Sequence, residues 1–420
     1  RIPAMQDTTG QRPAAGLPLP RIEFIALAAA LMSLNALAID IMLPGLQEIG
    51  ADLGVDNENH RQYVISAYFA GMAAALLPYG PASDHFGRRG PVLFGLVIYV
   101  GAAIGAAFSS SFEMLLALRF IQGIGAASTR VIAVSMVRDC FGGRQMAETM
   151  SLIFMVFMVI PVVAPSIGQV MMLVGDWRFI FIAMGLIGLA IALWAAFRMP
   201  ETLHPHDRRP FTLGSIGNAF GVVLTNRFSL LYTLASTAVF ASLFAFINSA
   251  QQIYVGIYGM GVLFPILFAL VAGFMALSSY LNSRLVVRFG MRRLSHGALT
   301  GFMLVSGVWF FWSLWGHLPI TPFVILFAIA MFQFGWIGSN FNSIAMEPLG
   351  HIAGSASSVQ GFIQTLGGGL IGALIGQAFD GTTTPLAAGF FTLAIVALLL
   401  VAIAERGRLY RSSPPNLTRE

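Results

Sequence analysis

The chain has 420 residues, of which 57% are hydrophobic and only 10% are charged. A soluble domain carries about 25% charged residues, so the composition argues against a soluble enzyme and predicts a protein embedded in a membrane. The net charge of +5 could suit a nucleic-acid partner. The positions of the basic residues favour another origin for this charge, and no nucleic acid is expected.

Twelve apolar segments follow one another along the chain, each long enough to cross a bilayer as a helix of about 20 residues. Because backbone groups in lipid must bond within their own segment, we expect helices throughout. The sequence predicts an all-α membrane protein with twelve transmembrane helices in two pseudo-symmetric six-helix bundles. The predicted spans are 22–45, 62–82, 90–109, 112–134, 146–172, 178–198, 229–254, 262–283, 294–315, 320–342, 354–378 and 385–405.

The basic residues lie mainly on one side of the predicted membrane. All 23 are arginines. With an even number of spans, only Arg61 and Arg178 fall in outer loops, while Arg119 lies within a span. The other 20 lie in the tails, the inner loops or the inner ends of helices, as Arg130 does. An excess of arginine in the inner loops is the positive-inside pattern, and it places both termini in the cytoplasm.

Polarity divides the chain into two halves joined by a linker. We expect a cytoplasmic tail at 1–21, a first bundle at 22–200, a cytoplasmic linker at 201–228, a second bundle at 229–405 and a second tail at 406–420. The linker ends with apolar residues at helical spacing, which predicts a short amphipathic helix on the inner surface. A disordered loop is the alternative for the first part of the linker.

The two halves repeat a short loop sequence. The loop after the second span contains DHFGRR, and the loop after the eighth contains VRFGMRR, so that Phe86–Gly87 recurs 203 positions later as Phe289–Gly290. Two six-helix units in the same orientation are parallel repeats, related by an axis along the membrane normal. This architecture places a substrate site between the halves, near the middle of the membrane.

The first of these loops, GPASDHFGRRGPVL, resembles the inner-loop signature of the major facilitator superfamily. The matching residues are Gly80, Asp84, Gly87, Arg88 and Arg89. Gly87 permits a tight turn between two helices. Asp84 can meet an arginine or a helix N-terminus of the other half and so latch one conformation. The alternative is that the arginines only hold the loop on the inner side.

Three more segments carry the resemblance. The fourth span holds LRFIQGIGAA, which is similar to the superfamily's fourth-helix motif. The fifth holds VIPVVAPSIGQ, which resembles its antiporter-associated signature at Pro165 and Gly168, with Pro161 as a second kink. Generic helix kinks are the alternative for these residues. The first span holds AIDIMLPGL, which resembles drug/proton antiporters of the Bcr/CflA group, exporters of bicyclomycin, phenicols and similar drugs.

Two charges lie at similar depth within the first and fourth spans. A charge in the middle of a membrane is costly by about 2.5–3.5 kcal/mol and needs a partner. Asp40 and Arg119 are predicted to form a pair, or a network with Gln122, whose separation changes with conformation. We expect Asp40 to bind H+ when the transporter faces out and to release it when it faces in. The alternative is that Asp40 sits in water near the helix end.

A drug cavity of aromatic and amide side chains is predicted from residues that share helix faces. The opposing interpretation is that aromatics pack helices and amides bridge them. The candidate substrate-binding residues are Tyr68, Phe244, Asn248, Gln251, Gln333, Trp336 and Asn340.

Together these patterns predict a proton-coupled multidrug efflux antiporter of the bacterial inner membrane that works by alternating access. It is expected to act as a monomer on small-molecule drugs within the lipid bilayer, with H+ as coupling ion and no metal or other cofactor. A proton-coupled metabolite transporter, as symporter or exporter, is the alternative. An enzyme is not expected because no catalytic motif is found, and two related halves suit alternating access better than a channel.

Overall fold

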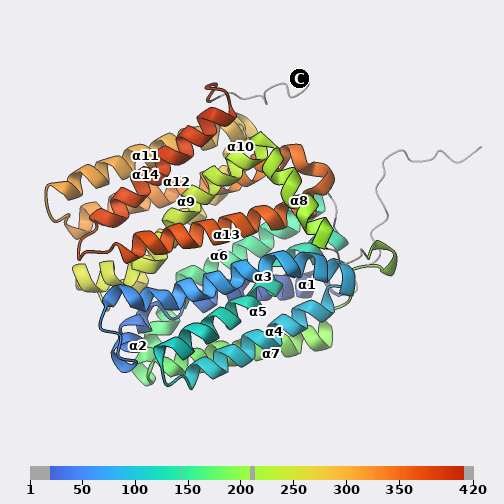
Figure 1. Cartoon of the computed structure of the whole chain (residues 1–420), viewed down its shortest axis with the longest axis horizontal. Coiled ribbons are helices and arrows are strands. Elements are labelled where there is room, and N and C mark those ends of the chain that lie inside the picture. The colour runs from blue at the N-terminus through green and yellow to red at the C-terminus, as the bar shows by residue number, and fades with distance from the viewer. Residues whose placement is uncertain (1–18, 142, 209–212, 411–420) are drawn as a thin grey trace, which may run out of the picture.

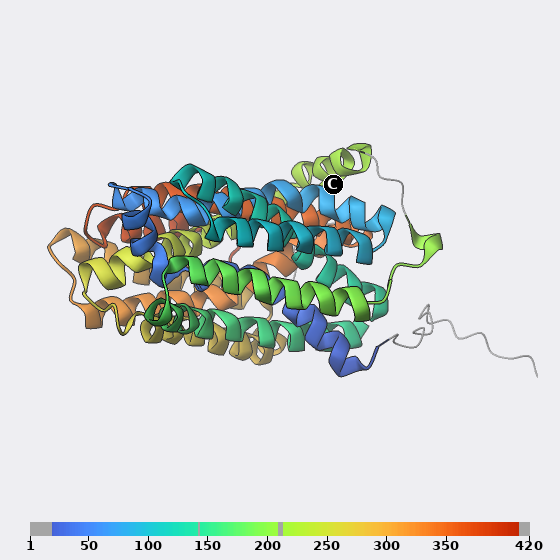
Figure 2. The same ribbon diagram turned by 90° about the horizontal axis from the view of Figure 1, so that it is seen from below.

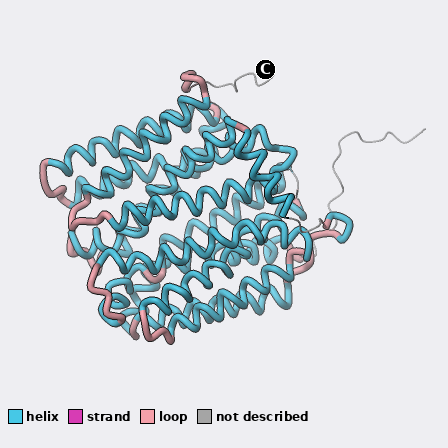
Figure 3. The backbone as a smooth tube through the Cα atoms, viewed as in Figure 1, coloured by secondary structure: helices cyan, strands magenta, loops and turns pink. Residues whose placement is uncertain are grey.

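The computed structural model describes residues 19–141, 143–208 and 213–410. The predicted tails therefore lie largely outside the described residues, as does a short part of the linker. Helices make up almost all of the described chain, as Figure 3 shows. They run roughly side by side, with their ends gathered at two opposite faces of the molecule (Figure 1).

Six long helices form the first half. They are α1 (Arg21–Asp40), α3 (Tyr63–Phe86), α4 (Arg89–Ala107), α5 (Phe112–Cys140), α6 (Gly143–Val174) and α7 (Trp177–Arg198). Short helical turns follow α1, namely η1 (Leu43–Gly45), α2 (Leu46–Asp52) and η2 (Glu58–Gln62). We call the face that carries α2 and η2 the outer end, and the opposite face the inner end.

Six long helices also form the second half. They are α9 (Arg227–Gln251), α10 (Phe264–Phe289), α11 (Met291–Leu314), α12 (Ile320–Met346), α13 (Ala353–Gln377) and α14 (Thr384–Ala404). The π-helical turn η4 (Gln252–Ile257) extends α9, and η5 (Glu347–Ile352) joins α12 to α13. The linker holds η3 (Pro205–Asp207) and α8 (Leu213–Thr225), whose Val223 packs against Leu349 and Val359 at the inner end.

The prediction of a twelve-helix membrane fold is confirmed. Eleven of the described helices are long and apolar enough to span a membrane, and the described part of α6 contributes a shorter apolar stretch at Val159–Val174. In Figure 1 the first half lies below and the second half above, and Figure 2 shows the same bundle from its underside. The halves meet along α3 with α13 and α6 with α10.

Glycines allow some helices of the first half to touch backbone to backbone. A Cβ on Gly71 of α3 would lie 1.9 Å from the carbonyl oxygen of Phe120, and a Cβ on Gly123 of α5 would lie 2.1 Å from that of Tyr68. Small residues at helix interfaces drive such close packing in membranes. This contact fixes α5, and with it Arg119, against α3.

Candidate functional site

The first membrane helix is interrupted at Asp40. α1 ends at this residue, and the chain continues through a turn into η1, which contains Pro44. Proline has no backbone N–H, so Pro44 cannot donate the helical hydrogen bond to the carbonyl of Asp40, four residues earlier. The Asp40 side chain is only 4% exposed. The sequence thus places a buried carboxylate at the free carboxyl end of a broken helix.

Arg119 reaches this break from α5. Its Nη2 donates to the carbonyl oxygen of Ala38 at 3.0 Å, its Nε to that of Val64 at 3.2 Å, and its Nη1 to Oε1 of Gln122 at 2.6 Å. The guanidinium also lies over the ring of Tyr68, 4.6 Å from its centroid. A cation at a helix C-terminus stabilises the exposed carbonyls, so Arg119 caps the end of α1.

The predicted direct pair of Asp40 and Arg119 is not formed in this conformation. Among the described residues no ion pair joins the two side chains, and the guanidinium is satisfied by carbonyl oxygens and Gln122 instead. The reason is the helix break, which offers Arg119 a backbone acceptor two residues before Asp40. The predicted network of Arg119 with Gln122 is present, and it reaches Asp40 only through the α1 backbone.

Polar residues that the sequence analysis missed continue this site towards the inner end. The amide of Asn35 donates to Thr129 Oγ1 at 3.0 Å, and the Tyr68 hydroxyl donates to Asn35 Oδ1 at 3.3 Å. All three side chains are buried. Tyr68 therefore joins this pair to Arg119. Its ring is fully buried and contacts Asn35 of α1 and Arg119 of α5. The role predicted for Tyr68 in substrate binding stays a prediction.

The proline and glycine motif of α6 packs directly behind Asp40. Pro165 and Gly168 are buried, while Pro161 is half-buried. A Cβ on Gly168 would lie 1.9 Å from the carbonyl oxygen of Ile41, the residue that follows Asp40. Glycine is thus required at this position for α6 to approach the break in α1.

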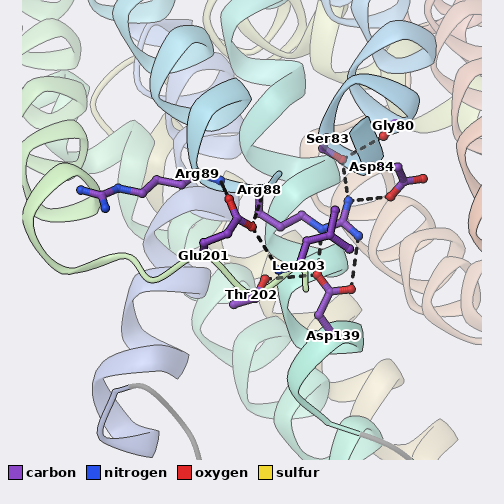
Figure 4. Close-up of polar contacts among 9 residues, drawn as sticks. All are labelled: Gly80, Ser83, Asp84, Arg88, Arg89, Asp139, Glu201, Thr202 and Leu203. Carbon is purple, nitrogen blue, oxygen red and sulfur yellow. Dashed lines mark hydrogen bonds and ion pairs between the residues drawn. The ribbon is translucent and has the colours of Figure 1, made fainter. Parts of the chain in front are cut away.

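At the inner end of the first half, Arg88 is the centre of an ionic cluster (Figure 4). Its Nη1 lies 2.6 Å from Asp84 Oδ1, its Nε lies 2.7 Å from Asp139 Oδ2, and the side chain is only 1% exposed. Burial by itself lowers the pKa of Arg88, but the Asp139 and Asp84 carboxylates outweigh it and leave the pKa raised. The cluster joins the ends of α3, α4 and α5.

The turn of this loop depends on Gly87 and Glu201. Gly87 has φ +93°, a left-handed conformation that favours glycine, and a Cβ there would lie 2.3 Å from a Glu201 oxygen. Glu201 accepts hydrogen bonds from the backbone N–H groups of Arg88 at 2.8 Å and Arg89 at 3.3 Å (Figure 4). A carboxylate at a helix N-terminus is stabilising, so Glu201 caps α4.

The latch predicted at Asp84 concerns one conformational state, and its contact with the second half stays a prediction. In this conformation the described ion pair of Asp84 is with Arg88 in its own half. The residue of the motif that meets the second half is Gly80, where a Cβ would lie 3.2 Å from Ser358 Oγ on α13.

The second half repeats this arrangement, in agreement with the loop repeat. Gly290 has φ +78°. Arg292, only 4% exposed, lies 2.6 Å from Glu347 and 2.9 Å from Glu405. The Glu405 carboxylate also accepts a hydrogen bond from the Tyr232 hydroxyl at 2.7 Å. Each half therefore holds a buried arginine of the loop against acids at the ends of its other helices.

The predicted substrate residues do not form one cluster. Gln333, Trp336 and Asn340 lie within the second half, where the Trp336 Nε1 donates to the carbonyl of Ser278 and the Asn340 amide donates to Asn282. Gln333 packs over Gly301 of α11. These three contacts bridge helices of one bundle.

The other predicted residues of the second half lie at its interface with the first. The Phe244 ring lies 4.3 Å from that of Phe69 on α3. Asn248 accepts a hydrogen bond from Ser66 at 3.3 Å, and Gln251 donates to Gln47 at 3.4 Å.

A set of amides closes the outer end between the halves, and the sequence analysis missed most of it. Asn59 and Gln62 of the first half bond to Gln252, Gly376 and Gln377 of the second. We call Asn59, Gln62, Gln252 and Gln377 the outer clamp. Its signal in the sequence is a group of amides at the ends of different spans on one side of the membrane.

A bundle of two related six-helix halves, with buried charges inside and ionic loops at one end, defines a secondary transporter. The chain belongs to the Major Facilitator Superfamily, whose family model matches residues 25–373. Members of this family are transporters, and the prediction that the chain is not an enzyme is confirmed by its relatives.

Curated relatives are similar over nearly the whole chain, and two of them carry names that refer to drug resistance. The bicyclomycin resistance protein homolog of Haemophilus influenzae is 31% identical over 379 residues, covering 90% of this chain and 94% of the relative. The multidrug resistance protein MdtL of Escherichia coli is 30% identical over 393 residues, covering 92% and 96%. The resemblance to drug exporters of the bicyclomycin type is confirmed.

Solved structures share the fold at low sequence identity. A bacterial homolog of the human lysosomal transporter Spinster, in its inward-facing and occupied conformation, aligns with a TM-score of 0.70 and 16% identity. The alignment covers 97% of this chain and all of that one. The human organic anion transporter MFSD10 aligns with a TM-score of 0.65 and 16% identity, covering 92% of this chain and 100% of that one.

Proposed function

We propose that the protein is a proton-coupled multidrug antiporter of the bacterial inner membrane, with both termini in the cytoplasm. It exports small apolar or amphipathic drugs of the phenicol or bicyclomycin kind in exchange for H+. The names of its relatives support the drug substrates. The observation that carries the coupling is the buried carboxylate of Asp40 at the break in α1.

Asp40 is the group that binds the proton. A buried carboxylate in a membrane protein is costly while it is charged, and no described residue forms an ion pair with it. Protonation removes the charge, and exposure to water on one side of the membrane allows it to return. Access to Asp40 must therefore alternate between the two sides, which the rocking of the two halves supplies.

Arg119 supplies the link between the proton and the helices. It caps α1 at Ala38 and contacts α3 at Val64. A charged Asp40 attracts this guanidinium, and a protonated Asp40 does not. Protonation of Asp40 thus weakens its attraction for Arg119, which contacts both α1 and α3. In this proposal drug and proton bind in alternation.

In this proposal the transporter alternates between a state closed at the outer end and a state closed at the inner end. Amides join the halves at the outer end in this structure. The ionic clusters around Arg88 and Arg292 hold each half together at the inner end. Each half thus moves as a body, and the outer clamp opens when the drug leaves.

The test uses inverted membrane vesicles with an acidic interior and a panel of drugs that includes chloramphenicol and bicyclomycin. A substrate drug should release protons from vesicles with the wild-type protein but not from those with Asp40→Asn. The matched control is Glu113→Gln, which removes an exposed acid at the outer start of α5. Proton release by a metabolite and by no drug would favour the alternative of a metabolite transporter.

A further inference from the structure

A second arginine of α5 has no role in the site described above. Arg130 lies eleven residues after Arg119 and ten before the end of the helix, within the membrane span. Its side chain is exposed. Among the residues that the structure describes, none forms an ion pair or hydrogen bond with its guanidinium.

Arg130 faces the interior of the bundle. Eleven residues advance a helix by three turns and leave an offset of about 20°, so Arg130 lies below Arg119 on one face, about 16 Å closer to the inner end. Arg119 on that face bonds to carbonyls of α1 and α3. The large exposed apolar residues of the outer half of α5, Met114, Phe120 and Ile121, lie on other faces.

The surroundings of Arg130 combine access with enclosure. Its side chain is accessible, yet Ala126, Ala133 and Val137, which share its face of α5, are buried. An accessible side chain on a helix face that is otherwise packed against protein lies at an opening between the helices. An arginine that faces lipid is costly, and its side chain must reach the headgroup region to offset its charge.

Comparison with the three buried arginines of the described residues shows which partners Arg130 lacks. Arg88 has two carboxylates, Arg292 has two, and Arg119 has two carbonyls and an amide. Arg130 has no acceptor of this kind among the described residues. An ionisable residue within a span that has no partner in the protein marks the path of a substrate or an ion.

We propose that Arg130 binds the carboxylate of anionic drugs as they enter from the inner side. The proposal rests on the proposed drug transport and names a substrate class for the same path. A guanidinium offers two parallel N–H donors that match a carboxylate. Arg130 lies three helical turns from Arg119 along α5, so the anion site is separate from the proton site at Asp40, which Arg119 adjoins.

Nalidixate, its uncharged carboxamide and chloramphenicol are the probes. Transport into inverted vesicles is measured for the wild type, Arg130→Gln, Arg130→Lys and Arg138→Gln. The last is the control, because Arg138 is exposed at the inner end of the same helix. Arg130→Gln should raise the half-saturating concentration of nalidixate about tenfold or more, as expected for a lost charged hydrogen bond. Arg130→Lys should restore part of this loss.

Transport of chloramphenicol and the carboxamide should be unchanged in all variants. Equal losses for all three compounds in Arg130→Gln would overturn the proposal, since they would indicate a structural or conformational role. An unchanged response to nalidixate in Arg130→Gln would also overturn it, as would a wild type that transports chloramphenicol and ignores nalidixate.

Binding separates this inference from the proposed function. Thermal unfolding of the purified protein in detergent is measured with nalidixate and with the carboxamide. Stabilisation by nalidixate that depends on Arg130 would support the anion site even if no drug moved protons. Stabilisation that is equal in the wild type and Arg130→Gln would contradict it.

Discussion

At the scale of single residues, the geometry around Arg119 distinguishes a positioned guanidinium from a simple positive charge. Its three nitrogens point to three acceptors on three helical segments. A lysine carries the same charge on one nitrogen and cannot reach acceptors in such different directions. Replacing Arg119 by lysine therefore keeps the positive charge but removes part of the hydrogen bonding that caps α1.

We predict that Arg119→Lys lowers drug-driven proton release about tenfold or more, because at least one charged hydrogen bond at the end of α1 is lost. Proton release from inverted vesicles measures the effect, with Arg138→Lys as the control for a changed basic residue on the same helix. Full activity in Arg119→Lys would show that charge alone is sufficient and that capping of α1 has no part in coupling.

At the scale of secondary-structure elements, the contact of α6 with α1 is as tight as two backbones allow. Gly168 lies against Ile41, immediately after Asp40. Any side chain at this position must push the helices apart or bend them. The proline and glycine motif of α6 therefore sets the position of the break that holds the proton site.

We predict that Gly168→Val destabilises the protein by about 1–3 kcal/mol, the usual penalty for overpacking, and reduces proton release more than protein abundance. Gly273→Val on α10 is the matched control, since a Cβ there meets nothing within 4 Å. Thermal unfolding in detergent and proton release are measured together. A variant at Gly168 as stable and active as the control would refute the packing argument.

At the scale of the whole molecule, the outer clamp joins the halves without any charge. Asn59 and Gln377 contact each other reciprocally, each donating its amide to a backbone carbonyl at the other's position. Alternating access requires this contact to break in every cycle. A covalent bond across it should therefore hold the transporter closed on the outer side.

We predict that Asn59→Cys/Gln377→Cys, in a Cys140→Ser background, loses transport when a short reducible reagent links the two thiols. Reduction should restore transport to the level of the untreated variant. Each single cysteine variant, treated with the same reagent, is the control. Undiminished transport by the linked protein would show that the clamp does not open during the cycle.

Much of this architecture could be predicted from the sequence because membranes impose simple rules. The lengths of the apolar segments predicted the helices, and the Phe–Gly pair in each half predicted the repeat. In the structure Gly87 and Gly290 form matching turns with positive φ. The partners of Arg119 could not be predicted, because the end of α1 at Asp40 presents backbone carbonyls that no side-chain pattern reveals.

The substrate residues were the least predictable part. Helical periodicity placed Asn248 and Gln251 on one face of α9, but it could not tell a cavity wall from the interface between the halves. Amides serve both roles equally well. The outer clamp became visible only when distant segments were brought together in space. The exposure of Arg130 and its lack of a described partner likewise required the structure.

The central claim is that Asp40 couples proton movement to drug movement. The most direct test compares two modes of transport of one drug, such as chloramphenicol, in vesicles that contain Asp40→Asn or the wild type. Uptake driven by a proton gradient requires the carboxylate, whereas exchange of labelled for unlabelled drug without a gradient requires only alternating access. We predict that Asp40→Asn abolishes the first and retains the second. Gradient-driven uptake that persists in Asp40→Asn would contradict the account.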